Sequence, residues 1–167
     1  MKDHFAMMAT YNAWANRRLY RMARQLSDEQ YRRDVSVYFK SLHGTLNHLL
    51  TADSIWMWRL TGQGVCPTGL DVVLFDDLGA LDEARRAEDE RLVSFVGNLT
   101  DARLEAAIEY RMFNGRSRSQ RLAEVLAHLF NHQTHHRGQA HAILTLLGVK
   151  EPEPLDLLWM SLEQTAH

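Results

Sequence analysis

The residues with the clearest chemistry lie in one short stretch that is rich in histidine. Four of the nine histidines of the chain fall between positions 128 and 136, and they are His128, His132, His135 and His136. Imidazole nitrogens are good ligands for zinc, nickel, iron and copper. Four imidazoles close together cannot easily be charged at the same time, because each charge opposes the next. A metal ion binds the neutral rings and removes this conflict, so the stretch predicts a metal site.

The stretch lies within a segment that the sequence predicts to be one long helix. Residues 119–147 contain no proline and only one glycine, Gly138, and their apolar residues recur at helical spacing. At about 100° per residue, the histidines and Gln139 share one stripe. Residues four apart are neighbours on a helix, so either His128 with His132 or His132 with His136 could aim at one point. The alternative is that the stripe forms a polar seam or a protein interface.

Zinc proteases use the same i, i+4 spacing in the motif H-E-x-x-H. The histidine stretch lacks that glutamate, so the protease function does not transfer to this chain.

Composition places few other demands on function. The chain has 167 residues and a net charge of -2, and 46% of its residues are apolar. We expect a single domain over residues 1–167, with no bulk electrostatic attraction to nucleic acid or to an anionic membrane. Cys66 is the only cysteine, so no intramolecular disulfide can form. With no apolar run long enough to span a bilayer and no signal peptide, the sequence predicts a cytoplasmic protein.

The chain as a whole predicts an all-α fold, a four-helix bundle with a small β-hairpin before the last long helix and a short C-terminal helix. The long helices are predicted at residues 3–26, 41–61, 76–99 and 119–147. Metal sites in such bundles are built from side chains on facing helices.

Local signals predict the remaining elements. Ser27 and Gln30 have the spacing of a capping box and begin a short turn of helix. Asn114-Gly115 predicts a hairpin within residues 107–118. Ser117 with Gln120 predicts a second capping box, at the start of the histidine-rich helix. Residues 155–162 are predicted to form a final apolar helix that covers the bundle.

The third predicted helix carries two charged residues on its apolar stripe, Arg85 and Glu88. In one interpretation they pair or extend to solvent at the edge of the helix. In the other they belong to a polar layer at the depth of the histidines and line or support a pocket.

Three stretches together resemble the DinB-like family of small helical-bundle metal proteins. They are residues 11–19 (YNAWANRRL), residues 46–48 (LNH) followed by Asp53, Trp56 and Arg59, and residues 131–139 (NHQTHHRGQ) after the Asn-Gly hairpin. The resemblance spans essentially the whole chain. It implies one divalent metal ion per chain, held by His48, His132 and His136. Zinc or nickel is expected, and imidazole ligands also suit iron or copper.

A metal-bound imidazole usually donates its other ring N–H to a nearby acceptor. Under this resemblance, several polar residues are candidates to accept such a hydrogen bond or to pack against the ligands. These candidates are His128, His135, Asp53, Asn131 and Gln139.

The expected activity follows from the ligand set and from the family. Three histidines leave a coordination position for water or substrate, and either bound water or a thiolate could act, so no catalytic side chain is predicted. The resemblance implies a thiol S-transferase that joins a low-molecular-weight thiol, such as bacillithiol or mycothiol, to a small electrophile. The alternatives are a metal-dependent hydrolase and a non-enzymatic metal-bearing stress or interaction protein. A homodimer is compatible with both the enzymatic and the non-enzymatic alternatives. Neither nucleic acid nor a membrane is an expected partner.

Overall fold

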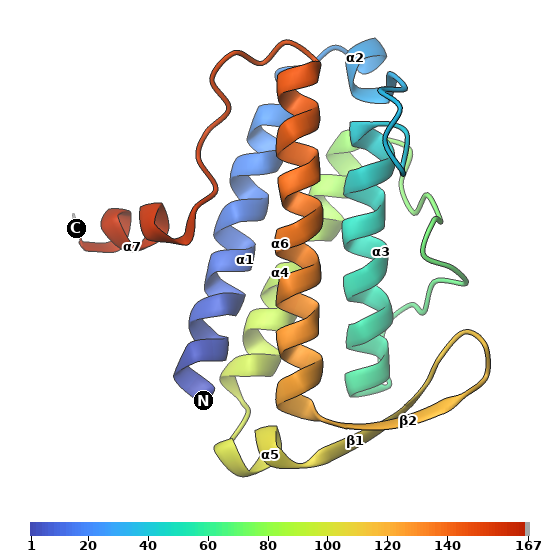
Figure 1. Ribbon diagram of the computed structural model, residues 1–167, viewed down its shortest axis with the longest axis vertical. Helices are drawn as coiled ribbons and strands as arrows, with labels where there is room; N and C mark the ends of the chain where they lie inside the picture. Colours follow the sequence, from blue (N-terminus) through green and yellow to red (C-terminus); the bar gives the residue numbers. More distant parts are fainter. Residues whose placement is uncertain (166–167) are drawn as a thin grey trace.

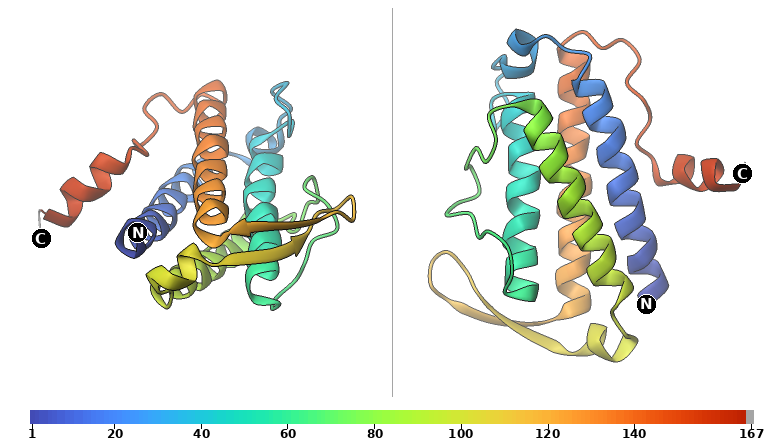
Figure 2. Two further views of the ribbon diagram at one scale, coloured as in Figure 1. Left: turned by 60° about the horizontal axis from the view of Figure 1, so that its bottom comes forward. Right: turned by 180° about the vertical axis from the view of Figure 1, so that it is seen from behind.

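The computed structural model describes residues 1–165 and contains the four long helices that the sequence predicts. They are α1 (Lys2–Ala23), α3 (Leu42–Thr61), α4 (Leu78–Gly97) and α6 (Leu122–Leu146). In Figure 1, α1 and α6 rise while α3 and α4 descend, so the loop between α3 and α4 must climb back along the bundle beside α3. Seen from behind, α4 lies across α1 and α3, on the opposite side of the bundle from α6 (Figure 2, right). The all-α bundle fold is confirmed.

Capping residues explain several of the helix ends. Ser41 accepts a hydrogen bond from the backbone N–H of Gly44 at the start of α3, and α3 ends at Gly62, whose φ is 68°. The predicted capping box of Ser27 and Gln30 is present at the start of α2 (Asp28–Arg32). Asp77 caps α4 by accepting from Ala80 N. Each of these side chains satisfies an N–H group that the first turn of a helix leaves free.

The start of α6 differs from the prediction. The N-cap of α6 is Arg121, which makes no side-chain cap. Ser117 and Gln120 instead belong to strand β2 (Ser117–Arg121), which pairs with β1 (Ala107–Arg111) in an antiparallel hairpin. The predicted capping box is therefore wrong, because pairing between the strands extends up to the first residue of the helix.

Two short elements also depart from the sequence-based expectations. The sequence did not predict α5 (Asp101–Glu105), which Thr100 caps through Arg103 N. The final helix, α7 (Leu157–Thr165), does not cover the bundle. It extends away from α1 (Figures 1 and 2) and buries only Met160, while Leu158 is 66% exposed. The approach of α7 is set by the segment 148–156, which returns along α1.

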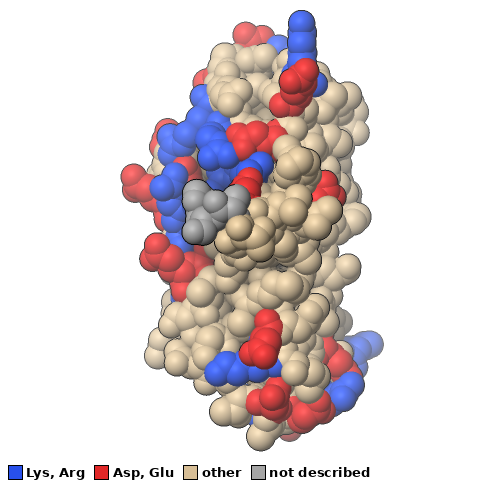
Figure 3. Space-filling model, turned by 90° about the vertical axis from the view of Figure 1, so that its left-hand side faces the viewer, with Lys and Arg blue, Asp and Glu red and all other residues tan. Residues whose placement is uncertain are grey.

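Ion pairs hold this C-terminal segment against α1. Arg18 and Arg21 both contact the Glu153 carboxylate, and Arg18 also pairs with Glu163. Figure 3 shows this side of the molecule, where basic and acidic side chains lie next to one another and leave a broad uncharged area. Among the helices described, none is long and apolar enough to cross a membrane.

A small apolar cluster joins Met160 of α7 to Tyr11, Trp14 and Ala15 of α1. The rest of the interior consists of two larger apolar clusters with a polar layer between them. One cluster includes Leu19, Leu46 and Leu144, and the other includes Leu92 and Phe130. The buried polar side chains between the clusters come from all four long helices, and they are Asn12, Asn16, Asp53, Arg85, Asp89, Gln133 and Arg137.

Arg85 is the centre of this layer. Its guanidinium contacts Asp53 Oδ2 at 2.9 Å and Asp89 Oδ1 at 3.0 Å, and each of these side chains is 5% exposed or less. Gln133 Nε2 donates to Asp53 Oδ1 at 2.6 Å. Buried charges are tolerated when they are paired and hydrogen-bonded, so the layer links α3, α4 and α6 at one depth.

Candidate metal centre

Three histidines from two helices meet at the seam between α3 and α6. His48 Nε2 lies 3.2 Å from His132 Nε2 and 3.2 Å from His136 Nε2. The three nitrogens all lie within 4.8 Å of one another. His132 and His136 are one helical turn apart, so both rings lean to the same side of α6, and α3 presents His48 from across the seam.

This spacing suits a single metal ion. Two nitrogens bound tetrahedrally at about 2.0–2.1 Å from zinc lie about 3.3 Å from each other, close to the 3.2 Å observed for two of the three pairs. The three side chains could therefore hold one divalent ion, with a further coordination position left for another molecule.

Hydrogen bonds orient two of the rings for this task. His48 Nδ1 donates to Leu70 O at 2.7 Å, and His136 Nδ1 lies 2.7 Å from the accepting Gln139 Oε1. With the hydrogen on Nδ1, the lone pair of each Nε2 faces the shared point. Partners of this kind fix the tautomer and the ring orientation of metal ligands.

Asn47 secures the loop that supplies the Leu70 carbonyl. Its Oδ1 accepts from Leu74 N at 2.8 Å and Phe75 N at 3.0 Å, and its Nδ2 donates to Phe75 O. Nothing in the sequence assigned Asn47 a role beyond its place in the motif LNH, because its partners in this loop lie 27 and 28 residues away.

The environment keeps the three imidazoles neutral. Burial lowers the pKa of His48 and of His136 below the usual 6.5. Burial, together with the neighbouring His136 and His48 rings, lowers the pKa of His132 to about 3. Neutral imidazole is the form that binds a metal, so the three rings are in their metal-binding protonation state at neutral pH.

A cavity of about 640 Å³ opens beside the three histidines. Its other lining residues are Tyr38, Phe39, Leu70, Asp71, His135 and Gln139. The Phe39 ring stacks on His48, with centroids 3.9 Å apart, and meets the edge of His136 at 5.6 Å. Two aromatic rings and one carboxylate thus line the open side of the site, and the sequence did not predict Tyr38, Phe39 or Asp71 as site residues.

The loop that carries Phe39 has an unusual backbone. Ser36 and Lys40 have φ values of 59° and 66°. Residues other than glycine are uncommon in this left-handed region, and such strain is found at functional sites. The backbone bond from Lys40 N to Val37 O, at 2.8 Å, helps to close the turn that places Phe39 on His48.

The other predicted site residues fall into two groups. Gln139 contacts a ligand directly, and His135 contacts Gln139 with its Nε2 3.2 Å from the amide nitrogen. The His128 ring is one turn from His132, with centroids 6.0 Å apart, and it packs edge-on against Trp56. These three residues lie along the seam with the ligands.

The structure does not bring Asp53, Asn131, Arg85 or Glu88 to the histidines. Asp53 and Arg85 pair inside the polar layer, and burial raises the pKa of Asp53 to about 6 although Arg85 opposes this rise. Glu88 pairs with Arg91 at the edge of α4, and Asn131 is exposed. Arg85 therefore belongs to a buried polar layer, as one of the two interpretations expected. Neither Arg85 nor Glu88 lines the pocket beside the histidines, because α4 lies on the far side of the bundle from α6.

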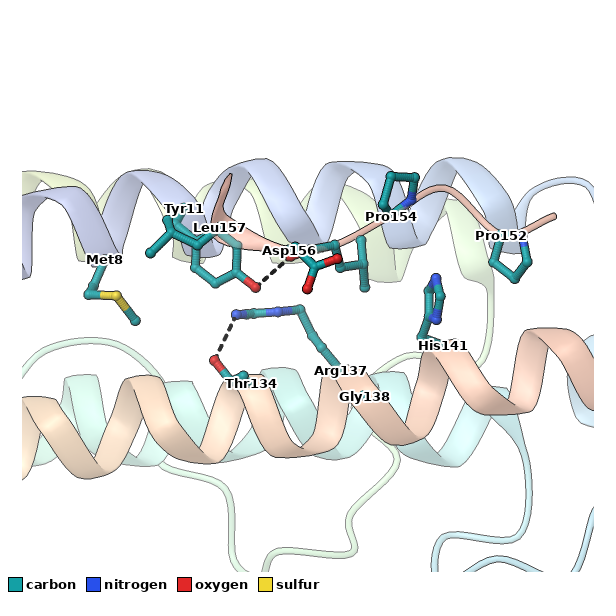
Figure 4. A pocket seen from close by; sticks show the side chains of 11 residues that line it. Met8, Tyr11, Thr134, Arg137, Gly138, His141, Pro152, Pro154, Asp156 and Leu157 are labelled. Atoms are coloured by element: carbon teal, nitrogen blue, oxygen red, sulfur yellow. Dashed lines mark hydrogen bonds between the residues drawn. The ribbon is translucent and has the colours of Figure 1, made fainter. Parts of the chain in front are cut away.

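A second cavity, of about 600 Å³, lies between α1, α6 and the C-terminal segment. Figure 4 shows the Arg137 side chain reaching between Tyr11 and Thr134. The Tyr11 hydroxyl donates to Leu155 O at 2.7 Å, and Arg137 also binds Asn12. The Tyr11 bond joins the C-terminal segment to α1, and the Arg137 bond joins α6 to α1. The lining of this cavity contains none of the three clustered histidines.

The fold and this geometry define a class, the helical-bundle proteins with a candidate metal site made of three histidines. Comparison with known proteins places the chain within it. The DinB family matches residues 1–165, and the chain belongs to this family. The resemblance inferred from the sequence is therefore confirmed.

Two relatives show how far the similarity extends. Protein DinB of Bacillus subtilis (strain 168) is 24% identical over 157 residues, which cover 89% of this chain and 88% of that protein. A crystal structure of a DinB-like protein from Bacillus cereus ATCC 10987 matches with a TM-score of 0.66 and 23% identity, covering 87% of this chain and 92% of the other. The structural match supports the fold.

Proposed function

We propose that the chain is a metal-dependent enzyme that binds one divalent ion through His48, His132 and His136. The convergence of three neutral Nε2 atoms on one point carries the proposal. Zinc or nickel is the proposed ion, and imidazole ligands also suit iron and copper. An ion at such a site activates a sulfur or oxygen nucleophile by Lewis-acid chemistry.

The proposed reaction is transfer of a small thiol to an electrophile. The thiol releases its proton to solvent, its sulfur forms the new bond to carbon, and the leaving group departs with the electron pair of the broken bond. The family resemblance favours this reaction, and the open cavity provides space for both reactants. The Phe39 ring and the exposed Tyr38 ring supply apolar contacts for an electrophile, and the Phe39 ring also shields His48 from solvent.

The first test measures metal content in protein made without a histidine tag. We expect about one divalent ion per chain, since one cluster of three histidines supplies ligands for one ion. His132→Ala should lose the ion and keep its helical circular dichroism, because the apolar clusters do not involve the histidines. His4→Ala is the matched control, since His4 is exposed and lies outside the cluster. Wild-type protein that takes up neither zinc nor nickel would contradict the proposed site.

The second test measures conjugation of 1-chloro-2,4-dinitrobenzene with a panel of low-molecular-weight thiols. Turnover should depend on the protein, disappear with a chelator, and be absent in His132→Ala but normal in His4→Ala. Chelator-sensitive ester hydrolysis without thiol transfer would instead identify a hydrolase. Metal binding without either turnover would favour the non-enzymatic alternative and overturn the enzymatic proposal.

A further inference from the structure

A smaller hollow lies next to the histidine site on the same seam. Its volume is about 270 Å³, and the residues that line it include Trp56, Arg59, Tyr110, Glu124 and His128. The His128 ring connects the two places, since it lies 5.4 Å from the Trp56 ring and 6.0 Å from the His132 ring. A molecule lying along the seam could therefore reach both.

Arg59 is the distinctive residue of this hollow. Its guanidinium carbon lies 4.7 Å from the Trp56 ring centroid, 5.3 Å from Tyr110 and 5.5 Å from Phe113. Aromatic rings bind a cation over their faces, so these contacts hold the side chain in place. They leave the N–H groups in the guanidinium plane available for a bidentate acceptor.

The part of the protein that the structure describes supplies no counter-ion to Arg59. Within residues 1–165, no carboxylate lies within 4.0 Å of it and no protein acceptor is hydrogen-bonded to its guanidinium. Burial lowers the pKa of Arg59 from its ordinary value, but an arginine remains charged in proteins. By contrast, the partly buried Arg91 pairs with Glu88, and the buried Arg85 pairs with two carboxylates.

The surroundings of the hollow also favour an anion. Glu124 is the acidic residue in its lining, and its carboxylate already binds Arg121 at 2.8 Å. The hairpin region 105–124 carries four arginines against three glutamates. One of these arginines, Arg118, pairs across the strands with Tyr110, whose ring contacts Arg59.

We propose that Arg59 binds the anionic group, a carboxylate or a phosphate, of an elongated substrate whose reactive end lies at the histidine site. Arg59 follows His48 by eleven residues on α3, so their backbones are separated by about 16 Å along the helix. The substrate must span a comparable distance, as a peptide-sized thiol with a terminal acidic group would. Placing the reactive end of the substrate at the histidine site rests on the proposed function, whereas anion binding by Arg59 does not.

An anion titration tests the assignment without any reaction. Succinate, inorganic phosphate and neutral succinamide are each added to the full-length protein, and the indole N–H resonance of Trp56 is followed by NMR. We expect saturable shifts of the Trp56 resonance with at least one of the two anions and none with succinamide. The anion that binds with the higher affinity identifies the group as a carboxylate or a phosphate. Loss of a charge-assisted bidentate contact should weaken binding about ten- to hundredfold in Arg59→Gln. Arg59→Lys should be intermediate, because lysine keeps the charge and loses the planar pair of donors.

Arg17→Gln is the matched control, since Arg17 is an exposed arginine on α1. Equal affinity in wild type and Arg59→Gln, no saturation with either anion, or equal binding of succinamide would overturn the assignment.

A kinetic comparison then connects Arg59 to the reaction. With metal-loaded enzyme, Arg59→Gln should raise the KM for a cysteinyl peptide thiol, Cys-Gly-Gly-Gly-Gly with a free C-terminal carboxylate, about ten- to hundredfold relative to the KM for the same peptide with a C-terminal amide. Arg17→Gln should leave that ratio unchanged. An unchanged ratio in Arg59→Gln would refute a role for this residue with thiols. If no thiol is turned over, the proposed function fails, and the anion titration still decides whether Arg59 forms an anion site.

Discussion

The hydrogen bond between His136 and Gln139 offers a sensitive test of the metal centre. Changing Gln139 to alanine removes the Oε1 atom that lies 2.7 Å from His136 Nδ1, while it leaves all three proposed ligands in place. The half-buried imidazole would then be free to rotate or to change its tautomer, and either change turns the lone pair of Nε2 away from the shared point. Gln139→Ala should therefore bind metal more weakly without unfolding.

The expected loss is about ten- to hundredfold in Kd, which is typical for removal of a group that orients a metal ligand. This corresponds to a loss of about 1.4–2.7 kcal/mol of binding free energy. A hydrogen bond that involves a charged group contributes an energy in this range. The bond is strengthened in this way because a bound ion withdraws electron density from the ring. His136→Ala should cost considerably more, since it removes a ligand outright.

The assay is a competition titration of zinc between metal-free protein and a colorimetric chelator. Gln139→Glu should bind at least as tightly as wild type, because the carboxylate remains an acceptor. Asn131→Ala is the matched control, as Asn131 is an exposed amide on the same helix. The reasoning would be refuted if Gln139→Ala retained wild-type affinity while His136→Ala lost the metal.

Two further predictions concern stability. Arg85→Leu leaves the buried Asp53 and Asp89 without their cation and should lower the free energy of unfolding in urea by about 3–5 kcal/mol. Arg86→Leu, at a pair whose arginine is largely exposed, should lower it by no more than about 1 kcal/mol. Similar losses in the two variants would contradict the buried network. The metal-free protein should lose stability as the pH falls from 6.5 towards 3, because the unfolded chain then binds protons that the folded His132 excludes, with its pKa lowered to about 3. The free energy of unfolding should fall by about 1.4 kcal/mol per pH unit for each such proton. The measurement is urea unfolding at a series of pH values. If the unfolding free energy of His132→Ala falls as steeply with pH as that of wild type, this explanation is excluded.

Much of the fold could be read from local patterns. Helical spacing of apolar residues located the four long helices, Ser27 marked the start of a short helix, and Asn114-Gly115 marked the hairpin. These signals act between residues a few positions apart, so the sequence contains them directly. The same local logic failed at Ser117, where a cap and a strand compete for one residue and pairing with β1 decided the outcome.

The candidate site divides along the same line. Residue types and the i, i+4 spacing indicated a histidine cluster on one face of the last long helix, but spacing alone left two pairs open, and the resemblance to the family chose between them. In the structure, His132 and His136 face His48 because of how α3 and α6 pack. The orientation of His48 depends on the backbone carbonyl of Leu70. Every residue has such a carbonyl, so the sequence does not indicate which one contacts His48.

The sequence by itself determined where the four long helices form, which of their faces are apolar, and that a group of imidazoles shares one stripe. Only the tertiary structure decided that α4 lies opposite α6, so that Arg85 pairs with Asp53 instead of lining the pocket. It also decided that Arg59 meets three aromatic rings and no carboxylate within the described residues. The physical reason is that periodicity is a property of neighbours along the chain, whereas contacts between helices depend on their rotation and on the path of the loops that connect them.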